Sequence, residues 1–147
     1  VQVEAIGNPK GIVSGTTKIT RDPVGLVMAS YAAKVIEASG LLKDGFCFQT
    51  GAGGASLAAA KFLKDIMLRK KIQGGVALGG ITGYLVQMLN EGCFQSLMDV
   101  QCFDLDAVES IRSNPKHQEM SALQYAAPGS RGAADLDLSS LVLPYLA

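Results

Sequence analysis

Residues 46–55, which read FCFQTGAGGA, have the residue types and spacing best suited to chemistry. Phe46 and Phe48 alternate with smaller or polar residues, as in a strand, and the glycines that follow remove most side-chain bulk. Residues 55–70 are mostly strong helix formers, so backbone N–H groups should gather at a helix N-terminus. Because such a terminus favours negative charge, we expect this turn to receive an oxyanion, a carboxylate or a phosphate.

A second glycine-rich segment, residues 76–83, reads VALGGITG and has the same order of apolar strand, glycines and helix-like spacing. Neither segment is a nucleotide motif, because G-x-G-x-x-G fails at Ser56 and a P-loop needs Gly-Lys-Ser/Thr. What remains is a pair of turns able to present N–H groups to a thioester or carboxylate oxygen. Close packing of helix on strand explains the glycines about equally well at this stage.

Other candidate residues fit both a functional and a structural interpretation. The hydroxyls of Ser14, Thr16 and Thr17 could bind a carboxylate or phosphate, although such runs are more often plain loops. Asp99 lies in a strand-like apolar stretch, where a paired core carboxylate is slightly favoured over a site residue. His117 has no nucleophile or carboxylate at a recognisable spacing, so we expect a loop histidine bonded to backbone.

Composition excludes several classes of protein. Thirteen basic and thirteen acidic residues cancel, which leaves no broad positive field to hold nucleic acid. No apolar run approaches the roughly 18 residues of a membrane span. Three widely spaced cysteines, Cys47, Cys93 and Cys102, predict reduced, buried thiols in a cytoplasmic protein without a metal site. The missing start Met and the apolar last residues suggest a domain from a longer chain.

At 147 residues the chain is sized for one domain. Asp22 before Pro23 is a strong helix start, and strand-like and helix-like segments alternate along the sequence. We predict strands over residues 1–6, from 46, from 76, and over 97–103, 117–123 and 136–143, with helices over 22–39, 55–70, 84–90 and 104–113. This alternation predicts an open α/β sheet, mostly parallel, with sites at the carboxyl ends of its strands.

Four long motifs carry a family resemblance: VSGTTKITRDP at residues 13–23, FQTGAGGASL at 48–57, ALGGITG at 77–83 and DVQCFD at 99–104. In order and spacing they resemble the alpha subunit of citrate lyase, a citrate CoA-transferase. The resemblance implies a three-layer α/β/α fold of the CoA-transferase type. It also implies that residues 1–147 are one incomplete domain, the first part of the second of two related domains, with residues 1–21 as a lead-in strand and loop.

The resemblance further implies a reaction and its partners. The acyl carrier protein, which is the gamma subunit, carries an acetyl group on a phosphopantetheine-type (dephospho-CoA-type) thiol. Citrate replaces this group, which gives citryl thioester and free acetate. The beta subunit then cleaves the citryl thioester, and free CoA is the alternative acyl carrier. No cofactor is expected to bind directly, and the implied assembly is an oligomer in the cytoplasm.

Site residues follow from the same resemblance. Backbone N–H groups at Gly53 and Gly54 would stabilise an oxyanion, so valine at either position should abolish exchange and leave the fold intact. The implied substrate-binding residues are Gly51, Ala52, Gly79, Gly80, Thr82, Gly83, Ser14, Thr16 and Thr17. Related CoA-transferases carry a nucleophilic glutamate where this chain has Gly83, which would instead leave room for a substrate carboxylate.

Without that glutamate, the implied mechanism has citrate itself attack the acetyl thioester, through a mixed anhydride. The chain departs from the family pattern Tyr-Ala-Asn-Pro at Ala127 and also in its last residues, LPYLA. Two alternatives stay open. One is a non-catalytic docking domain for the carrier protein or a subunit, and the other is a conventional CoA-transferase whose glutamate is Glu91 or Glu119.

Overall fold

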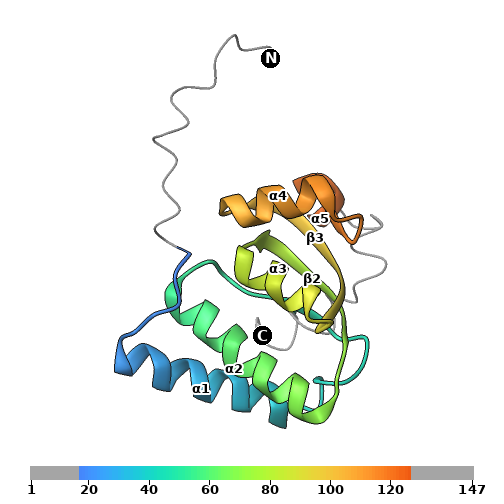
Figure 1. Cartoon of the computed structure of the whole chain (residues 1–147). Helices are drawn as coiled ribbons and strands as arrows, with labels where there is room; N and C mark the ends of the chain where they lie inside the picture. The colour runs from blue at the N-terminus through green and yellow to red at the C-terminus, as the bar shows by residue number, and fades with distance from the viewer. Residues whose placement is uncertain (1–16, 127–147) are drawn as a thin grey trace.

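The computed structural model describes residues 17–126, and Figure 1 shows their course. The helices are α1 (Pro23–Ala38), α2 (Gly54–Lys70), α3 (Gly83–Asn90), α4 (Leu105–Ser113) and α5 (Ala122–Ala126). The strands are β1 (Cys47–Gln49), β2 (Gly74–Ile81), β3 (Phe94–Cys102) and β4 (His117–Glu119).

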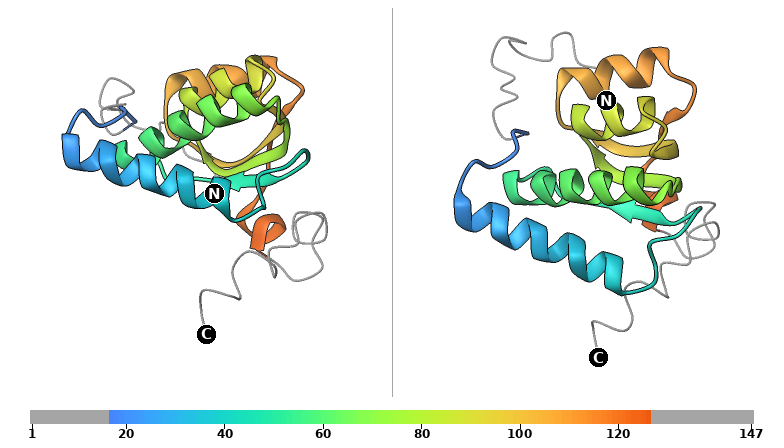
Figure 2. Two further views of the ribbon diagram at one scale, coloured as in Figure 1. Left: turned by 90° about the horizontal axis from the view of Figure 1, so that it is seen from below. Right: turned by 60° about the horizontal axis from the view of Figure 1, so that its bottom comes forward.

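The strands form one parallel sheet in the order β1-β2-β3-β4. Each strand is joined to the next by one helix, α2, α3 or α4. Because such crossovers are nearly always right-handed and the strands follow one another in chain order, the three helices lie on the same face of the sheet. Figures 1 and 2 show them together, with α1 beside α2 and the short α5 on the other side of the strands. The predicted parallel α/β fold is confirmed.

The core lies between the sheet and these helices. Its fully buried members include Leu63 and Met67 of α2, Leu85 and Met88 of α3, and Leu97 of β3. Burying a side chain of this size contributes roughly 1.5–3 kcal/mol. Three phenylalanine rings pack against one another at the β1 side, with centroids 5.7 to 6.4 Å apart: Phe46, Phe48 and Phe94. Phe46 and Phe94 stand at the amino ends of β1 and β3, so this packing holds that end of the sheet together.

The predicted helices are confirmed, and so is the helix start expected at Asp22. Asp22 and Asp104 cap α1 and α4, each accepting a hydrogen bond from the backbone N–H three residues further on, at 2.7 and 2.9 Å. β2 and β3 begin earlier than predicted, at Gly74 and Phe94. A Cβ at Gly74 would lie 2.5 Å from the Phe94 ring, so the glycine makes room for the neighbouring strand's aromatic side chain.

The strand predicted over residues 117–123 is wrong beyond Glu119, where the chain turns and enters α5. The cause is a capping box. The Ser121 hydroxyl accepts a hydrogen bond from the Gln124 backbone N–H at 3.1 Å, and the Gln124 Oε1 accepts one from the Ser121 N–H at 2.8 Å. This reciprocal pair starts a helix and so competes with extension of the strand.

The strands predicted over residues 1–6 and 136–143, together with Ser14, Thr16 and Ala127, lie outside the described residues. Within residues 17–126, no helix is long and apolar enough to cross a membrane. The same residues contain no group of three or more His, Cys, Asp or Glu side chains that could hold a metal ion. All three cysteines are free thiols, with Cys93 buried and the other two partly buried.

Candidate functional site

Two strand-to-helix connections meet at the carboxyl edge of the sheet. β1 leads into α2 through residues 50–53, and β2 leads into α3 through Thr82. The two strands are parallel neighbours, with Gln49 opposite Leu78, so the connections lie side by side. The glycine pattern predicts this juxtaposition, and ligands of open parallel sheets bind at this edge.

The N-terminus of α2 is open. Its N-cap is Gly53, in extended backbone conformation (φ −69°, ψ 154°), with no side chain to bond the first-turn N–H groups, and the first turn carries no acidic residue. Apart from Gly53 and its two chain neighbours, no described residue has an atom within 4 Å of the position that a Cβ of Gly53 would take. Gly51 and Ala52 precede it, the first exposed and the second half-buried. Within residues 17–126, the helix therefore presents uncapped N–H groups and the positive end of its dipole at the sheet edge.

Gly54 has a different role from Gly53. Its carbonyl accepts a hydrogen bond from the Thr20 N–H at 3.1 Å, and a Cβ at this position would lie 3.0 Å from both Lys18 O and Thr20 N. The lead-in segment thus crosses the first turn of α2. Valine at Gly54 would therefore press on that segment, so this position is a less clean test of the predicted oxyanion role than Gly53. At Gly53 the space for valine exists.

Gly79 and Gly80, predicted in a second glycine turn, lie inside β2 instead. Gly79 has φ +102°, and the pairing with β3 shifts register between the two glycines, which makes a β-bulge. A Cβ at Gly80 would lie 1.8 Å from the Phe103 ring. These glycines let the strand bulge and let Phe103 pack on it, so Thr82 and Gly83 alone make the turn.

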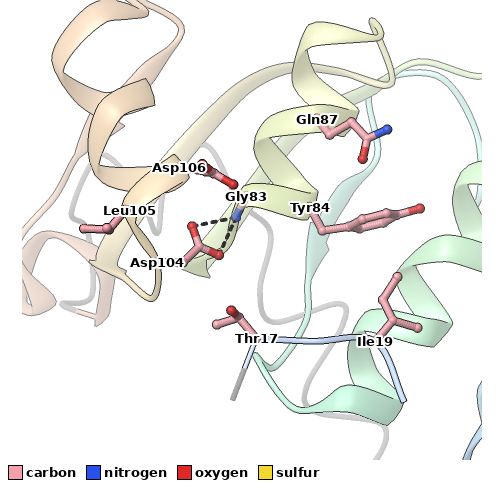
Figure 3. A pocket seen from close by; sticks show the side chains of 8 residues that line it. All are labelled: Thr17, Ile19, Gly83, Tyr84, Gln87, Asp104, Leu105 and Asp106. Atoms are coloured by element: carbon pink, nitrogen blue, oxygen red, sulfur yellow. Dashed lines mark hydrogen bonds between the residues drawn. The ribbon is translucent and has the colours of Figure 1, made fainter. Parts of the chain in front are cut away.

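The N-terminus of α3 is closed by a carboxylate, as Figure 3 shows. The Gly83 N–H donates to both carboxylate oxygens of Asp104, at 2.9 and 2.8 Å, and the Ala107 N–H donates to the same side chain at 2.9 Å. One aspartate therefore caps both α3 and α4. A Cβ at Gly83 would lie 2.8 Å from Asp106 Cβ and Oδ2, so the glycine makes room for the Asp106 side chain.

A pocket of about 530 Å³ opens beside this terminus (Figure 3), and its lining is Thr17, Ile19, Gly83, Tyr84, Gln87, Asp104, Leu105 and Asp106. Thr17, predicted to bind substrate, reaches it from the lead-in segment. Asp104 and Asp106 place two carboxylates on its wall. Since like charges repel, this pocket suits an anionic substrate group less well than the open end of α2 does.

Thr82 occupies the N-cap position of α3 but makes no capping hydrogen bond with its side chain. The residue is 1% exposed, and its Oγ1 has no hydrogen-bond partner among residues 17–126. A buried hydroxyl left in this state costs about 1–3 kcal/mol. Thr82 therefore connects β2 to α3 and carries a buried hydroxyl that forms no hydrogen bond within the described residues.

Gln49, which the sequence analysis does not single out, stands between the two connections. The Tyr125 hydroxyl donates to its Oε1 at 2.6 Å, and a Cβ at Gly79 would lie 3.3 Å from its Cγ and Nε2. Burial raises the pKa of Tyr125, so the phenol remains a donor. With Oε1 engaged, Nε2 is the donor left for a ligand. A glutamine two residues before the first glycine of the turn could be recognised in the sequence as a candidate donor, whereas its partner Tyr125 lies 76 residues away.

Asp99 and His117 belong to a buried polar cluster rather than to a loop. His117 Nδ1 lies 2.9 Å from Ser110 Oγ, and Nε2 lies 3.3 Å from Asp99 Oδ2. The expectation of a loop histidine bonded to backbone is wrong, because His117 begins β4 and is 2% exposed. Asp99 also accepts hydrogen bonds from the Gln101 N–H and the Cys102 thiol, and is the paired core carboxylate. Burial and the adjacent Asp99 raise the pKa of Cys102 to about 12, which makes it a poor nucleophile.

The two glutamates considered for a conventional transferase lie away from both connections. Glu91 is the C-cap of α3, at the opposite end of that helix from Gly83, and pairs with Lys64 at 2.6 Å. The hydrogen bond from Lys64 lowers its pKa. Glu119 ends β4, which is the opposite edge strand from β1. Neither is placed to attack a thioester held at Gly53.

Known proteins resemble the chain throughout its length. The family model described as "Citrate lyase, alpha subunit (CitF)" matches residues 1–146. Citrate lyase alpha chains of Klebsiella pneumoniae, Haemophilus influenzae and Escherichia coli (strain K12) are 47%, 48% and 45% identical over 146 residues. Each match covers 99% of this chain and 29% of the relative, so the chain spans less than a third of the relatives' length.

A solved structure agrees with this result. It is a protein of Streptococcus mutans, assigned as the alpha subunit of citrate lyase and solved in complex with citrate. Its TM-score is 0.81 at 47% identity, over 88% of this chain and 26% of that chain. By sequence along its whole length and by fold, the chain belongs to the citrate lyase alpha subunit family.

Proposed function

We propose that the full-length protein replaces acetate by citrate on the thiol of an acyl carrier protein, which gives a citryl thioester and free acetate. The observation that carries the proposal is the uncapped N-terminus of α2 at Gly53, with the amide of Gln49 at the end of β1, where the connection to α2 begins. Such a set of donors stabilises negative charge as it develops on a thioester oxygen. Membership of the citrate lyase alpha subunit family supports citrate as the second substrate.

In the proposed reaction, a carboxylate oxygen of citrate attacks the carbonyl carbon of the acetyl thioester. First-turn N–H groups of α2 and Gln49 Nε2 donate to the resulting oxyanion. The carbon–sulfur bond then breaks. The thiolate departs, and citrate and acetate remain joined as a mixed anhydride. The same thiolate attacks the citryl carbonyl of the anhydride, and acetate departs. Atoms and charge balance without an added reductant, oxidant or proton donor.

In the proposed reaction, no acyl group becomes covalently bound to the enzyme. Gly83 has no side chain, Asp104 is engaged by two helix N-termini, and the two candidate glutamates lie elsewhere. Catalysis would therefore come from holding the two substrates together and from stabilising the oxyanion. Free CoA is the alternative acyl carrier, and we propose that the oligomeric complex includes a further subunit that cleaves the citryl thioester.

The test uses the full-length alpha subunit with acetyl carrier protein and citrate. Mass spectrometry of the carrier should show acetyl replaced by citryl, with one acetate released for each citryl group formed. Trapping with borohydride or hydroxylamine should leave every glutamate unmodified. A glutamyl adduct would establish the conventional mechanism instead, and failure to form citryl carrier would overturn the proposed function.

A docking role is the second candidate, and the outer face of α1 favours it. Large apolar side chains more than half exposed lie there at helical spacing: Val24, Val27, Met28, Tyr31 and Val35. Exposed apolar surface of this kind marks interaction sites. Isothermal titration separates the candidates, because a docking domain should bind the acetyl carrier protein and ignore citrate.

A further inference from the structure

A groove runs between α1 and α2 and ends at the first glycine connection; we call it the α1–α2 groove. Its volume is about 390 Å³, and its lining comes from α1, from the end of β1 with the following turn, and from the first two turns of α2. Small-molecule sites usually occupy about 300–1,000 Å³. The groove is thus large enough for a slender ligand and is continuous with the candidate site.

Apolar side chains form most of its walls, and four of them are alanines. Ala29 and Ala32 come from α1, Ala55 and Ala59 come from α2, and the Phe48 ring comes from β1. Among the described residues that line it, none carries a charge. Because burying a charged group without a partner is costly, the groove suits an uncharged ligand.

The groove becomes polar where it meets the edge of the sheet. Gln49, Thr50, Gly51 and Ser56 line it there. The Thr50 hydroxyl lies 3.3 Å from the Ser56 carbonyl, whereas Gln49 keeps its Nε2 donor. A ligand lying along the groove would therefore end at the first turn of α2, where the proposed oxyanion donors stand.

The two proposed substrates differ in the property that this groove selects. Citrate carries three carboxylates and would lose hydration in an apolar groove without gaining a charge partner. The pantetheine-type arm of the carrier is uncharged between its phosphate and its thioester, is slender, and presents the reacting carbonyl at its tip. We propose that the α1–α2 groove binds this arm and places its thioester at the first turn of α2. This inference rests on the proposed function and names the subsite for one of its substrates.

The first experiment narrows the groove in the full-length subunit with Ala32→Leu. Ala32 is exposed, so a larger side chain there occupies the groove without entering the core. We expect the KM for acetyl carrier protein to rise about tenfold, as for a misfitted apolar pocket. The KM for citrate should change by less than about twofold. Ala38→Leu is the matched control, since Ala38 is exposed on the same helix outside the groove, and it should leave both constants unchanged.

The second experiment measures occupancy directly. Ala32→Cys in the full-length subunit is labelled with a maleimide, with the wild type as the control for native thiols. Acetyl-pantetheine should slow the labelling and citrate should not. An unchanged KM for the carrier in Ala32→Leu would overturn the proposal, as would protection by citrate alone. Labelling blocked before any ligand is added would do the same, because another part of the polypeptide would then fill the groove. If the wild type forms no citryl thioester, the proposed function fails, while protection by acetyl-pantetheine still supports the groove.

Discussion

The N-termini of α2 and α3 stand side by side at the edge of the sheet and differ in what faces them. Both helices follow neighbouring parallel strands, and both begin with glycine. At α3 the carboxylate of Asp104 takes the Gly83 N–H, and Asp106 fills the adjacent space. At α2 the N-cap Gly53 supplies no side chain and faces open space among the described residues.

This difference favours α2 over α3 as the terminus that binds a ligand. The chain uses an aspartate to cap α1, and a single aspartate serves α3 and α4 together. Capping side chains stabilise a helix by about 0.5–2 kcal/mol relative to alanine, so leaving α2 uncapped forgoes available stability. A terminus left open among capped neighbours is what an oxyanion site requires. Mutations that close the N-terminus of α2 or open the N-terminus of α3 test this difference.

Closing α2 should have the largest effect. In Gly53→Asp the new carboxylate would bond the first-turn N–H groups, as Asp22 does at α1, and would repel an oxyanion. We expect turnover by the full-length subunit to fall about 10²- to 10³-fold, the loss typical of a missing oxyanion donor. Stability should instead rise by about 0.3 kcal/mol. Citryl carrier formation and urea unfolding measure the two quantities.

Gly53→Ala is the control for this variant. Its methyl group fits the open space and leaves the N–H groups uncapped, so most of the activity should remain. If Gly53→Asp turned over as fast as the wild type, the end of α2 could not be the oxyanion site. Equal losses in the alanine and aspartate variants would point to backbone freedom at this position as the property that matters.

Opening α3 should cost stability. Asp104→Ala removes the cap of α4 and leaves the Gly83 N–H without its carboxylate. A cap and hydrogen bonds to a charged group together make the expected loss about 3 kcal/mol in the free energy of unfolding. Asp22→Ala, which removes the cap of one helix, is the matched control and should cost about 1 kcal/mol. Equal losses in urea unfolding would show that Asp104 does not hold two helices.

Mutations at Gln49 and at its partner Tyr125 should have a smaller effect on turnover. Tyr125→Phe removes the hydrogen bond that orients Gln49, and one such bond is worth about 0.5–1.5 kcal/mol, or up to about tenfold in rate. Gln49→Leu removes the donor itself and should lower turnover at least as much. Because Tyr125 acts through Gln49, the tyrosine change should have no further effect in the Gln49→Leu background. Additive losses in this cycle would show that Tyr125 works independently.

The order of helices and strands could be predicted because its signals are local. Asp22 before Pro23 marks the start of α1, and Asp104 marks the start of α4. The capping box at Ser121 and Gln124 is equally local, and a serine followed three residues later by glutamine indicates a helix start there rather than a strand.

The difference between the two helix termini depends on contacts that the fold creates. The two glycine segments look alike in sequence, yet Asp104 lies 21 residues from the Gly83 that it caps. The packing of Phe103 on Gly80 and the bond of Tyr125 to Gln49 also join different elements. No residue spacing announces such contacts, so the difference between the two termini could not be predicted from the sequence.

Thr82 provides the finest test of the comparison, because its hydroxyl has no partner in the described part of the chain. Thr82→Val keeps the shape and removes the unpaired hydroxyl, so the free energy of unfolding should rise, by up to about 1–3 kcal/mol. If the hydroxyl binds substrate, kcat/KM should fall in this variant and recover in Thr82→Ser. A loss of stability of about 1 kcal/mol or more would mean that the fold uses the hydroxyl. The α3 terminus would then be structural throughout, and the chemistry would belong to α2 alone.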